Sequence, residues 1–290
     1  MRPFLLTLLL AAAPAAATRA TPPHMTAQPS TGHVTVNGIA LYYEQYGPAA
    51  GTPLVLLPGG GSTIQATFGR FLPLISRHRR VIAFEEQGHG RSSTHPGPER
   101  FEQSADDVAA ALEQLGIARA DVMGFSNGAS NALLLTIRHP ERVRKLVFAS
   151  SFTKRAGAQS WFWPMMASAN FEGMPAALKA EFLRVNPDTA ALRRMHDRDL
   201  ERMHAFTDLA EEQIRGVKAS TLIICGDHDV VTPEHALELS RLIVGARLLI
   251  LPGSHGDYLG EITTTARPLA IEATAELVEE FLAEAADQRK

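Results

Sequence analysis

The stretch DVMGFSNGAS, residues 121–130, places one serine between two glycines, where an apolar run gives way to a helical pattern. Residues 121–125 predict a buried strand, and residues 127–140 predict a helix that ends at a proline. A serine on so sharp a turn has a strained backbone, and glycines two positions to either side let strand and helix approach closely. Taken alone, the pattern suits a nucleophilic Ser126 and a structural glycine turn equally well.

The rest of the chain alternates short β-like runs with helical ones. Several inner runs are continuously apolar, which is typical of parallel strands covered on both faces, whereas the first two alternate as an antiparallel edge hairpin does. Helices are predicted at residues 104–116, with Ser104 as the cap, and at about 271–286. The pattern predicts an α/β sandwich with an eight-stranded, mostly parallel sheet and helices on both faces. The eight predicted strands are residues 33–36, 40–46, 53–58, 80–85, 121–125, 145–151, 220–226 and 246–252.

The alternation is interrupted between residues 153 and 217, where the sequence is helical and rich in Met and aromatic residues. We expect a helical cap there, inserted into one α/β core made of residues 32–152 and 218–290. A Met-rich surface repacks readily, which favours a tolerant apolar substrate pocket under the cap. The alternative is that most of these side chains pack the cap onto the core. The candidate pocket residues are Trp161, Phe162, Trp163 and Met166.

The composition is that of a globular protein with a sizeable core. The 290 residues are 45% hydrophobic and 20% charged, close to the averages for soluble domains. Lys and Arg number 28 against 31 Asp and Glu, and no long basic run is present, so no nucleic-acid partner is expected. The lone Cys225 excludes an intramolecular disulfide. The oligomeric state stays open.

The amino-terminal region predicts export. Residues 1–20 combine Arg2, an apolar stretch and small residues suited to cleavage, which is the pattern of a secretory signal peptide. The apolar stretch is well short of the roughly 20 residues that cross a bilayer, so stable membrane insertion is not expected. Residues 21–31 predict a flexible leader. The protein is expected in the periplasm or outside the cell; the alternative is that Met25 is the true start and the protein is cytoplasmic.

The order of candidate residues along the chain tests the role of Ser126. A serine hydroxyl is a weak nucleophile that needs a histidine base, and the base needs a carboxylate to orient it. Asp227 and Asp229 follow the seventh predicted strand, and His255 follows the eighth. This order along separate strand ends rarely arises by chance, and it favours Ser126 as a nucleophile over the glycine turn.

Five motifs together resemble the α/β-hydrolase family over residues 32–290, with the cap inserted after the sixth strand. The resemblance implies that Ser126 is the nucleophile, His255 the base and Asp229 the acid. Asp227 is the alternative acid, and the role first expected for it is hydrogen bonding to the loop. The motifs are GFSNG (124–128), GDHDVVTP (226–233), GSHGDY (253–258), LLPGGGST (56–63) and FEEQGHGRSS (84–93).

The segment LLPGGGST resembles the family's oxyanion loop, whose backbone N–H groups stabilise the charge that develops on a carbonyl oxygen. The resemblance implies one donor from Gly60, with Gly61 as the alternative, and a second from Asn127, the residue after the nucleophile. Pro58 stands where many relatives have histidine. In FEEQGHGRSS, we interpret His89 as structural.

The resemblance implies a serine hydrolase that uses neither a metal nor another cofactor and acts on a small-molecule acyl substrate. Cleavage of a carboxylic ester or lactone of a small to medium apolar substrate is the first expectation. The same residues also serve C–C bond hydrolases, thioesterases, aminopeptidases, cofactor-free haloperoxidases and acyltransferases, so the fold does not select the substrate. Outside the enzymes, a ligand receptor that retains these residues is the alternative.

Overall fold

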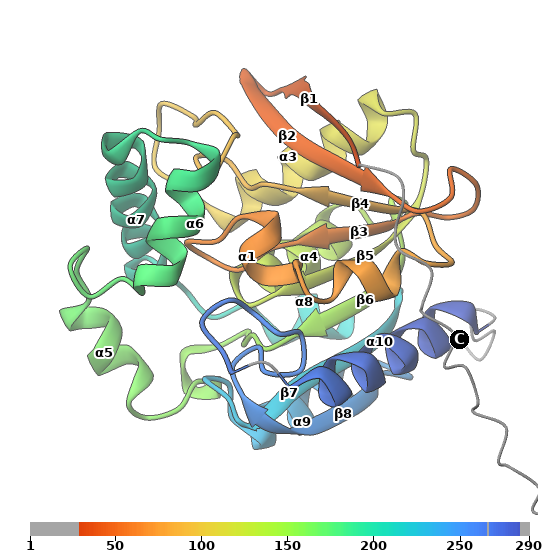
Figure 1. Cartoon of the computed structure of the whole chain (residues 1–290). Coiled ribbons are helices and arrows are strands. Elements are labelled where there is room, and N and C mark those ends of the chain that lie inside the picture. The colour runs from red at the N-terminus through yellow and green to blue at the C-terminus, as the bar shows by residue number, and fades with distance from the viewer. Residues whose placement is uncertain (1–28, 266, 285–290) are drawn as a thin grey trace, which may run out of the picture.

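An eight-stranded sheet forms the centre of the molecule (Figure 1). The computed structural model describes residues 29–265 and 267–284; the predicted signal peptide (1–20) and residues 21–28 of the predicted leader lie outside the described residues. All eight predicted strands are present, in the order β1-β2-β4-β3-β5-β6-β7-β8. The first begins inside the stretch predicted as leader. The strands are β1 (Ser30–Val36), β2 (Ile39–Tyr46), β3 (Leu54–Leu57), β4 (Val81–Phe84), β5 (Ala120–Phe125), β6 (Val143–Ala149), β7 (Ser220–His228) and β8 (Arg247–Ser254).

Antiparallel pairing is confined to the β1 edge of the sheet. β1 pairs with β2 and β2 with β4 in antiparallel fashion, whereas the pairs from β4 through β3, β5, β6 and β7 to β8 are parallel. β3 and β4 are short apolar strands buried along their whole length, as parallel strands covered on both faces should be. The predicted α/β sandwich is therefore confirmed.

Each face of the sheet is covered by helices and has its own hydrophobic cluster (Figure 1). On one face, α3, α4, α8 and α9 pack around residues such as Leu112 and Leu133. On the other, α1, α2 and α10 pack around residues such as Phe68 and Phe281. These helices are α1 (Ile64–Phe68), α2 (Leu72–Ile75), α3 (Phe101–Gln114), α4 (Asn127–Arg138), α8 (Glu211–Arg215), α9 (Pro233–Leu242) and α10 (Pro268–Ala283).

Helix α3 begins three residues earlier than the sequence predicts. Ser104, the predicted cap, lies inside the helix, where its hydroxyl donates a hydrogen bond to the Glu86 carboxylate at 2.6 Å. Arg100 occupies the cap position, and its side chain makes no capping hydrogen bond there. Burial of Phe101 and the bond from Ser104 to Glu86 thus decide where the helix starts, against the local capping preference.

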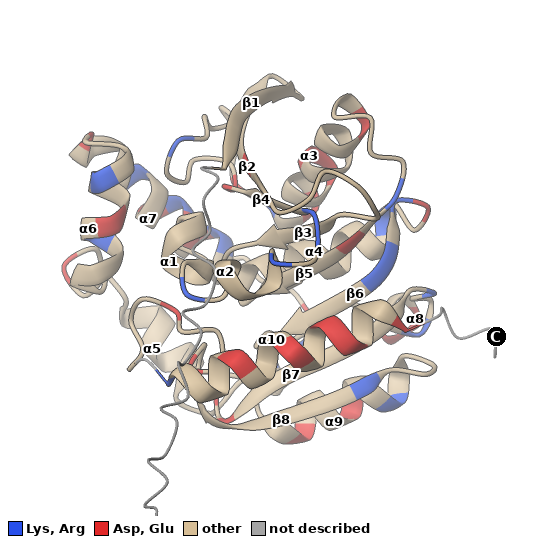
Figure 2. Ribbon diagram, turned by 45° about the vertical axis from the view of Figure 1, so that its right-hand side comes forward, with Lys and Arg blue, Asp and Glu red and all other residues tan. Residues whose placement is uncertain are grey.

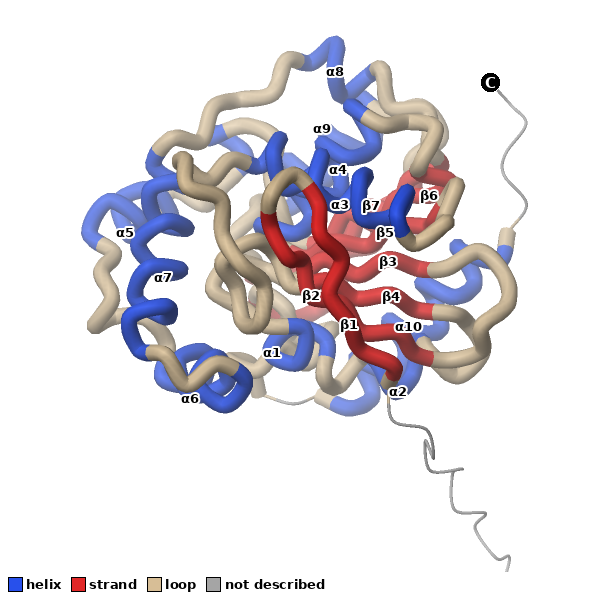
Figure 3. The backbone as a smooth tube through the Cα atoms, turned by 90° about the horizontal axis from the view of Figure 1, so that it is seen from above, coloured by secondary structure: helices blue, strands red, loops and turns tan. Residues whose placement is uncertain are grey.

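Residues 153–217, called the inserted segment below, lie between β6 and β7 and are helical, as predicted. Helices α5, α6 and α7 group together beside the sheet (Figure 3). Basic residues mark α7 and acidic residues line α10 (Figure 2). In the described part of the chain, no helix combines the length and hydropathy that a membrane span needs. Besides α8, the segment contains a 3-10 turn (Arg155–Gly157), α5 (Phe162–Ser168), α6 (Ala176–Val185) and α7 (Thr189–His204).

Candidate active site

Ser126 is the single residue between β5 and α4, and its backbone is strained. Its φ is +55° and its ψ −124°, a backbone conformation that residues other than glycine rarely adopt. A Cβ on Gly124 would lie 2.0 Å from the Gly128 carbonyl oxygen, and one on Gly128 would lie 2.1 Å from the Leu57 carbonyl oxygen. Both flanking positions therefore require glycine, and the turn presents the Ser126 hydroxyl at the end of the sheet.

The structure brings Ser126, His255 and Asp229 into one chain of hydrogen bonds. The Ser126 Oγ lies 3.1 Å from the His255 Nε2, and the His255 Nδ1 lies 2.6 Å from the Asp229 Oδ1. With Nδ1–H donating to the carboxylate, Nε2 is left to accept the serine proton. The Phe125 ring packs against the imidazole with ring centroids 4.6 Å apart. The arrangement can move a proton from the serine to the histidine.

Asp229 is buried and held as a carboxylate. Its oxygens accept hydrogen bonds from the backbone N–H groups of Val230 (2.7 Å) and Gly226 (3.0 Å) and from the Ser150 hydroxyl. Burial alone would raise the pKa of Asp229, but the imidazole of His255 and these donors outweigh burial and hold the pKa below its ordinary value. The carboxylate is thus a fixed negative charge behind the imidazole.

Asp227 faces away from this chain of hydrogen bonds. Its Oδ1 accepts from the Gly253 N–H at 2.7 Å and contacts the His228 ring nitrogen at 2.9 Å. These contacts, the Gly253 N–H first, lower the pKa of Asp227. The side chain is about half exposed and bonds the end of β8, whereas Asp229 is the carboxylate that reaches His255.

The glycine loop after β3 lies beside the serine. A Cβ on Gly60 would lie 2.4 Å from the Asn127 side-chain nitrogen, so the loop and the start of α4 are in close contact. Asn127 is the first residue of α4, where a backbone N–H has no acceptor within the helix. The Gly61 N–H already donates to the Asp199 Oδ2 at 2.6 Å. Among the described residues, the Gly60 N–H has no acceptor and stays available.

Two pockets meet at Ser126. The larger, about 560 Å³, lies between Ser126 and the inserted segment, and four methionines line it: Met165, Met166, Met174 and Met203. The smaller, about 40 Å³, lies on the other side of the serine among Phe101, Phe152 and Phe206. No Lys or Arg lines either pocket among the described residues. An apolar, electrically neutral group fits both pockets best.

Only two of the four predicted pocket residues line this space. Phe162 borders both pockets and Met166 borders the larger one. Trp161 borders neither and is 49% exposed. Trp163 borders neither because its ring packs against Phe152 and under the guanidinium of Arg155. Trp161 precedes α5, and Trp163 points about 100° away from Phe162, so neither lies beside Ser126 and their role in binding stays a prediction.

Other residues of the site were not found from the sequence. Ser150 bonds Asp229 and the Tyr258 hydroxyl, which lies 2.6 Å from it. On α7, Asp199 and Arg202 are buried although they read as charged surface residues. Their signal is their spacing: with Leu192 and Met195 they form a buried stripe repeating every three or four residues. Charges on an apolar stripe mark a buried polar contact.

This chain is similar in sequence and in fold to known hydrolases. Residues 52–261 match the family described as alpha/beta hydrolase fold. A 2-hydroxymuconate semialdehyde hydrolase from Pseudomonas sp. (strain CF600) is 30% identical, over 81% of this chain and 88% of its own. A putative carbamate hydrolase from Caulobacter sp. (strain K31) is 27% identical, over 77% and 90%. The crystal structure of the enol-lactonase from Burkholderia xenovorans LB400 superimposes with a TM-score of 0.68 at 26% identity, over 87% and 100%.

Proposed function

The chain belongs to the alpha/beta hydrolase fold family and is a hydrolase, and on that premise we propose that it cleaves a neutral carboxylic ester or lactone through an acyl-enzyme on Ser126. One observation carries the proposal: Ser126, His255 and Asp229 form a continuous chain of hydrogen bonds beside an apolar pocket. A serine, a base and an orienting carboxylate in this arrangement perform acyl transfer.

In the first half of the reaction, the Ser126 Oγ attacks the carbonyl carbon while its proton passes to the His255 Nε2. The carbonyl oxygen becomes an oxyanion, which the N–H groups of Gly60 and Asn127 stabilise; each such donor contributes about 10²- to 10³-fold in kcat. Asp229 stabilises the imidazolium without taking the proton. The imidazolium then protonates the departing alkoxide, and the acyl group remains on the serine.

In the second half, water takes the place of the alcohol. His255 accepts a proton from the water, whose oxygen attacks the acyl carbon, and a second oxyanion forms at the same donors. Collapse of this intermediate returns the proton to the Ser126 Oγ and releases the carboxylic acid. In a lactone, the alcohol and the acid are the two ends of one opened ring.

The charge of the pockets favours a neutral substrate over an acidic one. The relative from Pseudomonas sp. is named for 2-hydroxymuconate semialdehyde, a carboxylate. In this chain no Lys or Arg lines the two pockets within the described residues. Burying an unpaired carboxylate there costs free energy. The semialdehyde is therefore the second candidate, and the 30% identity to this relative supports it.

Steady-state hydrolysis tests the proposal. p-Nitrophenyl esters of graded acyl length, a neutral lactone and 2-hydroxymuconate semialdehyde would be assayed with wild-type protein, Ser126→Ala and the control Ser240→Ala, a serine on α9 whose hydroxyl bonds within its own helix. We expect turnover of the neutral substrates and a loss of about 10⁴-fold or more in kcat for Ser126→Ala, with folding retained. Equal rates for Ser126→Ala and wild type would overturn the proposal; preference for the semialdehyde would select the second candidate.

A further inference from the structure

A carboxylate of the inserted segment reaches the glycine loop. Asp199 on α7 accepts a hydrogen bond from the Gly61 N–H at 2.6 Å, across 138 positions of sequence. The same oxygen, Oδ2, lies 3.0 Å from the His89 Nε2, and the other oxygen accepts from Arg202. Asp199 is 8% exposed. Its carboxylate is therefore fully engaged by protein donors and is not available to bind a substrate.

His89 holds the carboxylate from one side as a cation. Its Nδ1 lies 2.9 Å from the Gln87 carbonyl oxygen, and its Nε2 lies 3.0 Å from the Asp199 Oδ2 and 3.2 Å from the Gly61 nitrogen. Burial would lower the pKa of His89, but the charges of Asp199 and Glu86 outweigh burial and raise it to about 10. His89 thus fixes Asp199 in place.

Arg202 holds the carboxylate from the other side. Its guanidinium, 1% exposed, bonds both Asp199 and Glu86 and lies 4.5 Å from the Phe101 ring centroid. Burial would raise the pKa of the Asp199 carboxyl, but Arg202 and His89 outweigh burial and lower it. Asp199 is thus an ion fixed between two cations, and it can hold the loop without moving.

The loop is anchored on both sides of Gly60. The Gly59 N–H donates to the Thr67 Oγ1 at 3.2 Å, and the Gly61 N–H donates to Asp199. Three successive glycines have no side chains to restrict their backbone, so hydrogen bonds must do so; the Gly61 N–H also lies 3.2 Å from the His89 Nε2, but its shorter bond is the one to Asp199. Because both neighbours are occupied, the N–H of Gly60 is the one that the loop can offer to a substrate.

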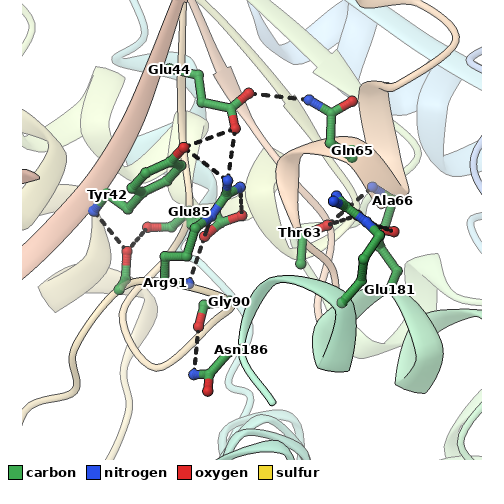
Figure 4. Close-up of polar contacts among 12 residues, drawn as sticks. Tyr42, Glu44, Thr63, Gln65, Ala66, Glu85, Gly90, Arg91, Glu181 and Asn186 are labelled. Carbon is green, nitrogen blue, oxygen red and sulfur yellow. Dashed lines mark hydrogen bonds and ion pairs between the residues drawn. The ribbon is translucent and has the colours of Figure 1, made fainter. Parts of the chain in front are cut away.

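Other contacts hold the inserted segment in place but do not touch these amides (Figure 4). Glu181 accepts from the Thr63 hydroxyl at 3.3 Å, and the Asn186 amide donates to the Gly90 carbonyl oxygen at 2.8 Å. Among the described residues, Asp199 is the only side chain of the inserted segment that bonds a backbone N–H of residues 59–61.

We infer that Asp199 is a positioning residue of the oxyanion site: by holding the Gly61 N–H, it sets the orientation of the Gly60 N–H toward the carbonyl oxygen at Ser126. The inference rests on the proposed function. An oxyanion donor is effective only if it is aimed before the charge develops. Through Asp199, stabilisation of the oxyanion in the core therefore depends on the position of α7.

A transition-state analogue tests the inference directly. With a butyl trifluoromethyl ketone, the Ser126 Oγ adds to the carbonyl carbon, its proton passes to His255, and the carbonyl π electrons become the lone pair of an oxyanion. The matching butyl methyl ketone binds without this charge. For Asp199→Asn, we expect about 10- to 100-fold weaker inhibition by the trifluoromethyl ketone and an equal fall in kcat. KM and the affinity for the methyl ketone should stay within about threefold.

Glu86→Gln is the matched control, because Glu86 bonds Arg202 as Asp199 does but does not contact the loop. We expect this variant to lower Tm and to leave trifluoromethyl ketone inhibition unchanged. If Asp199→Asn does not fold, amide exchange of ¹⁵N-glycine in the wild-type protein decides: Gly61 should exchange far more slowly than the exposed Gly51. Equally fast exchange would overturn the inference.

The outcomes separate the two proposals. If Asp199→Asn matches wild type in kcat and in trifluoromethyl ketone inhibition, Asp199 has no positioning role while the hydrolase proposal stands. If the wild-type protein itself neither binds the trifluoromethyl ketone nor hydrolyses esters, both proposals fail together.

Discussion

The two sides of Ser126 are built differently. On the side of the base, Asp229 and His255 come from the loops after β7 and β8, and the groups that bond the Asp229 carboxylate belong to the core. On the side of the oxyanion, the glycine loop after β3 is held by Asp199 from α7 of the inserted segment. The side chains that transfer the proton are therefore bonded by core groups, whereas the glycine loop that stabilises the charge is bonded directly by a side chain of the inserted segment.

The largest expected effect on kcat comes from a substitution on the base side, outside the inserted segment. Asp229→Asn should lower kcat by about 10⁴-fold, because an amide in this position favours the wrong tautomer of His255. Asp227→Asn is the control, since Asp227 bonds the Gly253 N–H at the end of β8 and the His228 ring but not His255. Kinetics on the best ester substrate should show the control within about threefold of wild type. The reverse ranking would move the acid to Asp227.

An intermediate effect is expected on the oxyanion side. Gly60→Pro removes the backbone N–H itself and should cost about 10²- to 10³-fold in kcat. Gly60→Ala keeps the N–H, and its Cβ would lie 2.4 Å from the Asn127 side-chain nitrogen and 3.1 Å from the Asp199 Oδ2. The kcat values of the two variants would be compared once their Tm values are shown to be equal. The alanine variant should retain most of the activity. Equal losses for both would show that space around Gly60, and not its donor, is what matters.

The smallest expected effect is on stability, where the two sides of Ser126 differ in their dependence on pH. The pKa of His89 is raised to about 10 from 6.5, so its contribution to stability is complete below 6.5 and is lost as pH rises through 10. The pKa of Asp229 is lowered from 3.8, so its contribution is constant above 3.8 and is lost only in acid. Glu99 is buried, and its pKa is raised from 4.5 to about 7. Its contribution to stability is therefore lost as pH rises through 7, before the range in which His89 loses its own.

Thermal unfolding of wild type and His89→Gln from about pH 7.5 to about pH 10 isolates the histidine. The wild-type Tm should fall by about 4 °C more than that of the variant, which corresponds to about 1–2 kcal/mol in a domain of this size. Parallel curves would show that His89 carries no charge in the folded protein, and the cationic support of Asp199 would then rest on Arg202 alone.

The sequence predicts best what depends on short stretches of chain. The eight strands were found from apolar or alternating runs, and the turn at Ser126 from its glycines, because both depend on neighbouring residues. Asp229 and His255 were found because each follows a strand, and parallel strand ends converge at one edge of a sheet. These two features together account for the core side of the site.

The inserted segment was predicted less well for a physical reason. The bond from Asp199 to Gly61 joins residues 138 positions apart, and no local pattern encodes such a pairing. Trp161 and Trp163 were assigned to the pocket because the sequence does not show which face of a short helix turns inward. Ser104 failed as a cap because it bonds Glu86 instead. The signal peptide, outside the described residues, stays a prediction.

The most direct test of the central claim is covalent labelling with a fluorophosphonate probe. In this reaction the Ser126 Oγ bonds phosphorus and displaces fluoride, so intact-mass and peptide mass spectrometry locate the nucleophile. We expect one phosphonyl adduct, on the peptide that contains Ser126, and none in Ser126→Ala. An adduct on another residue, or no adduct on folded wild-type protein, would contradict the assignment of Ser126 as the nucleophile.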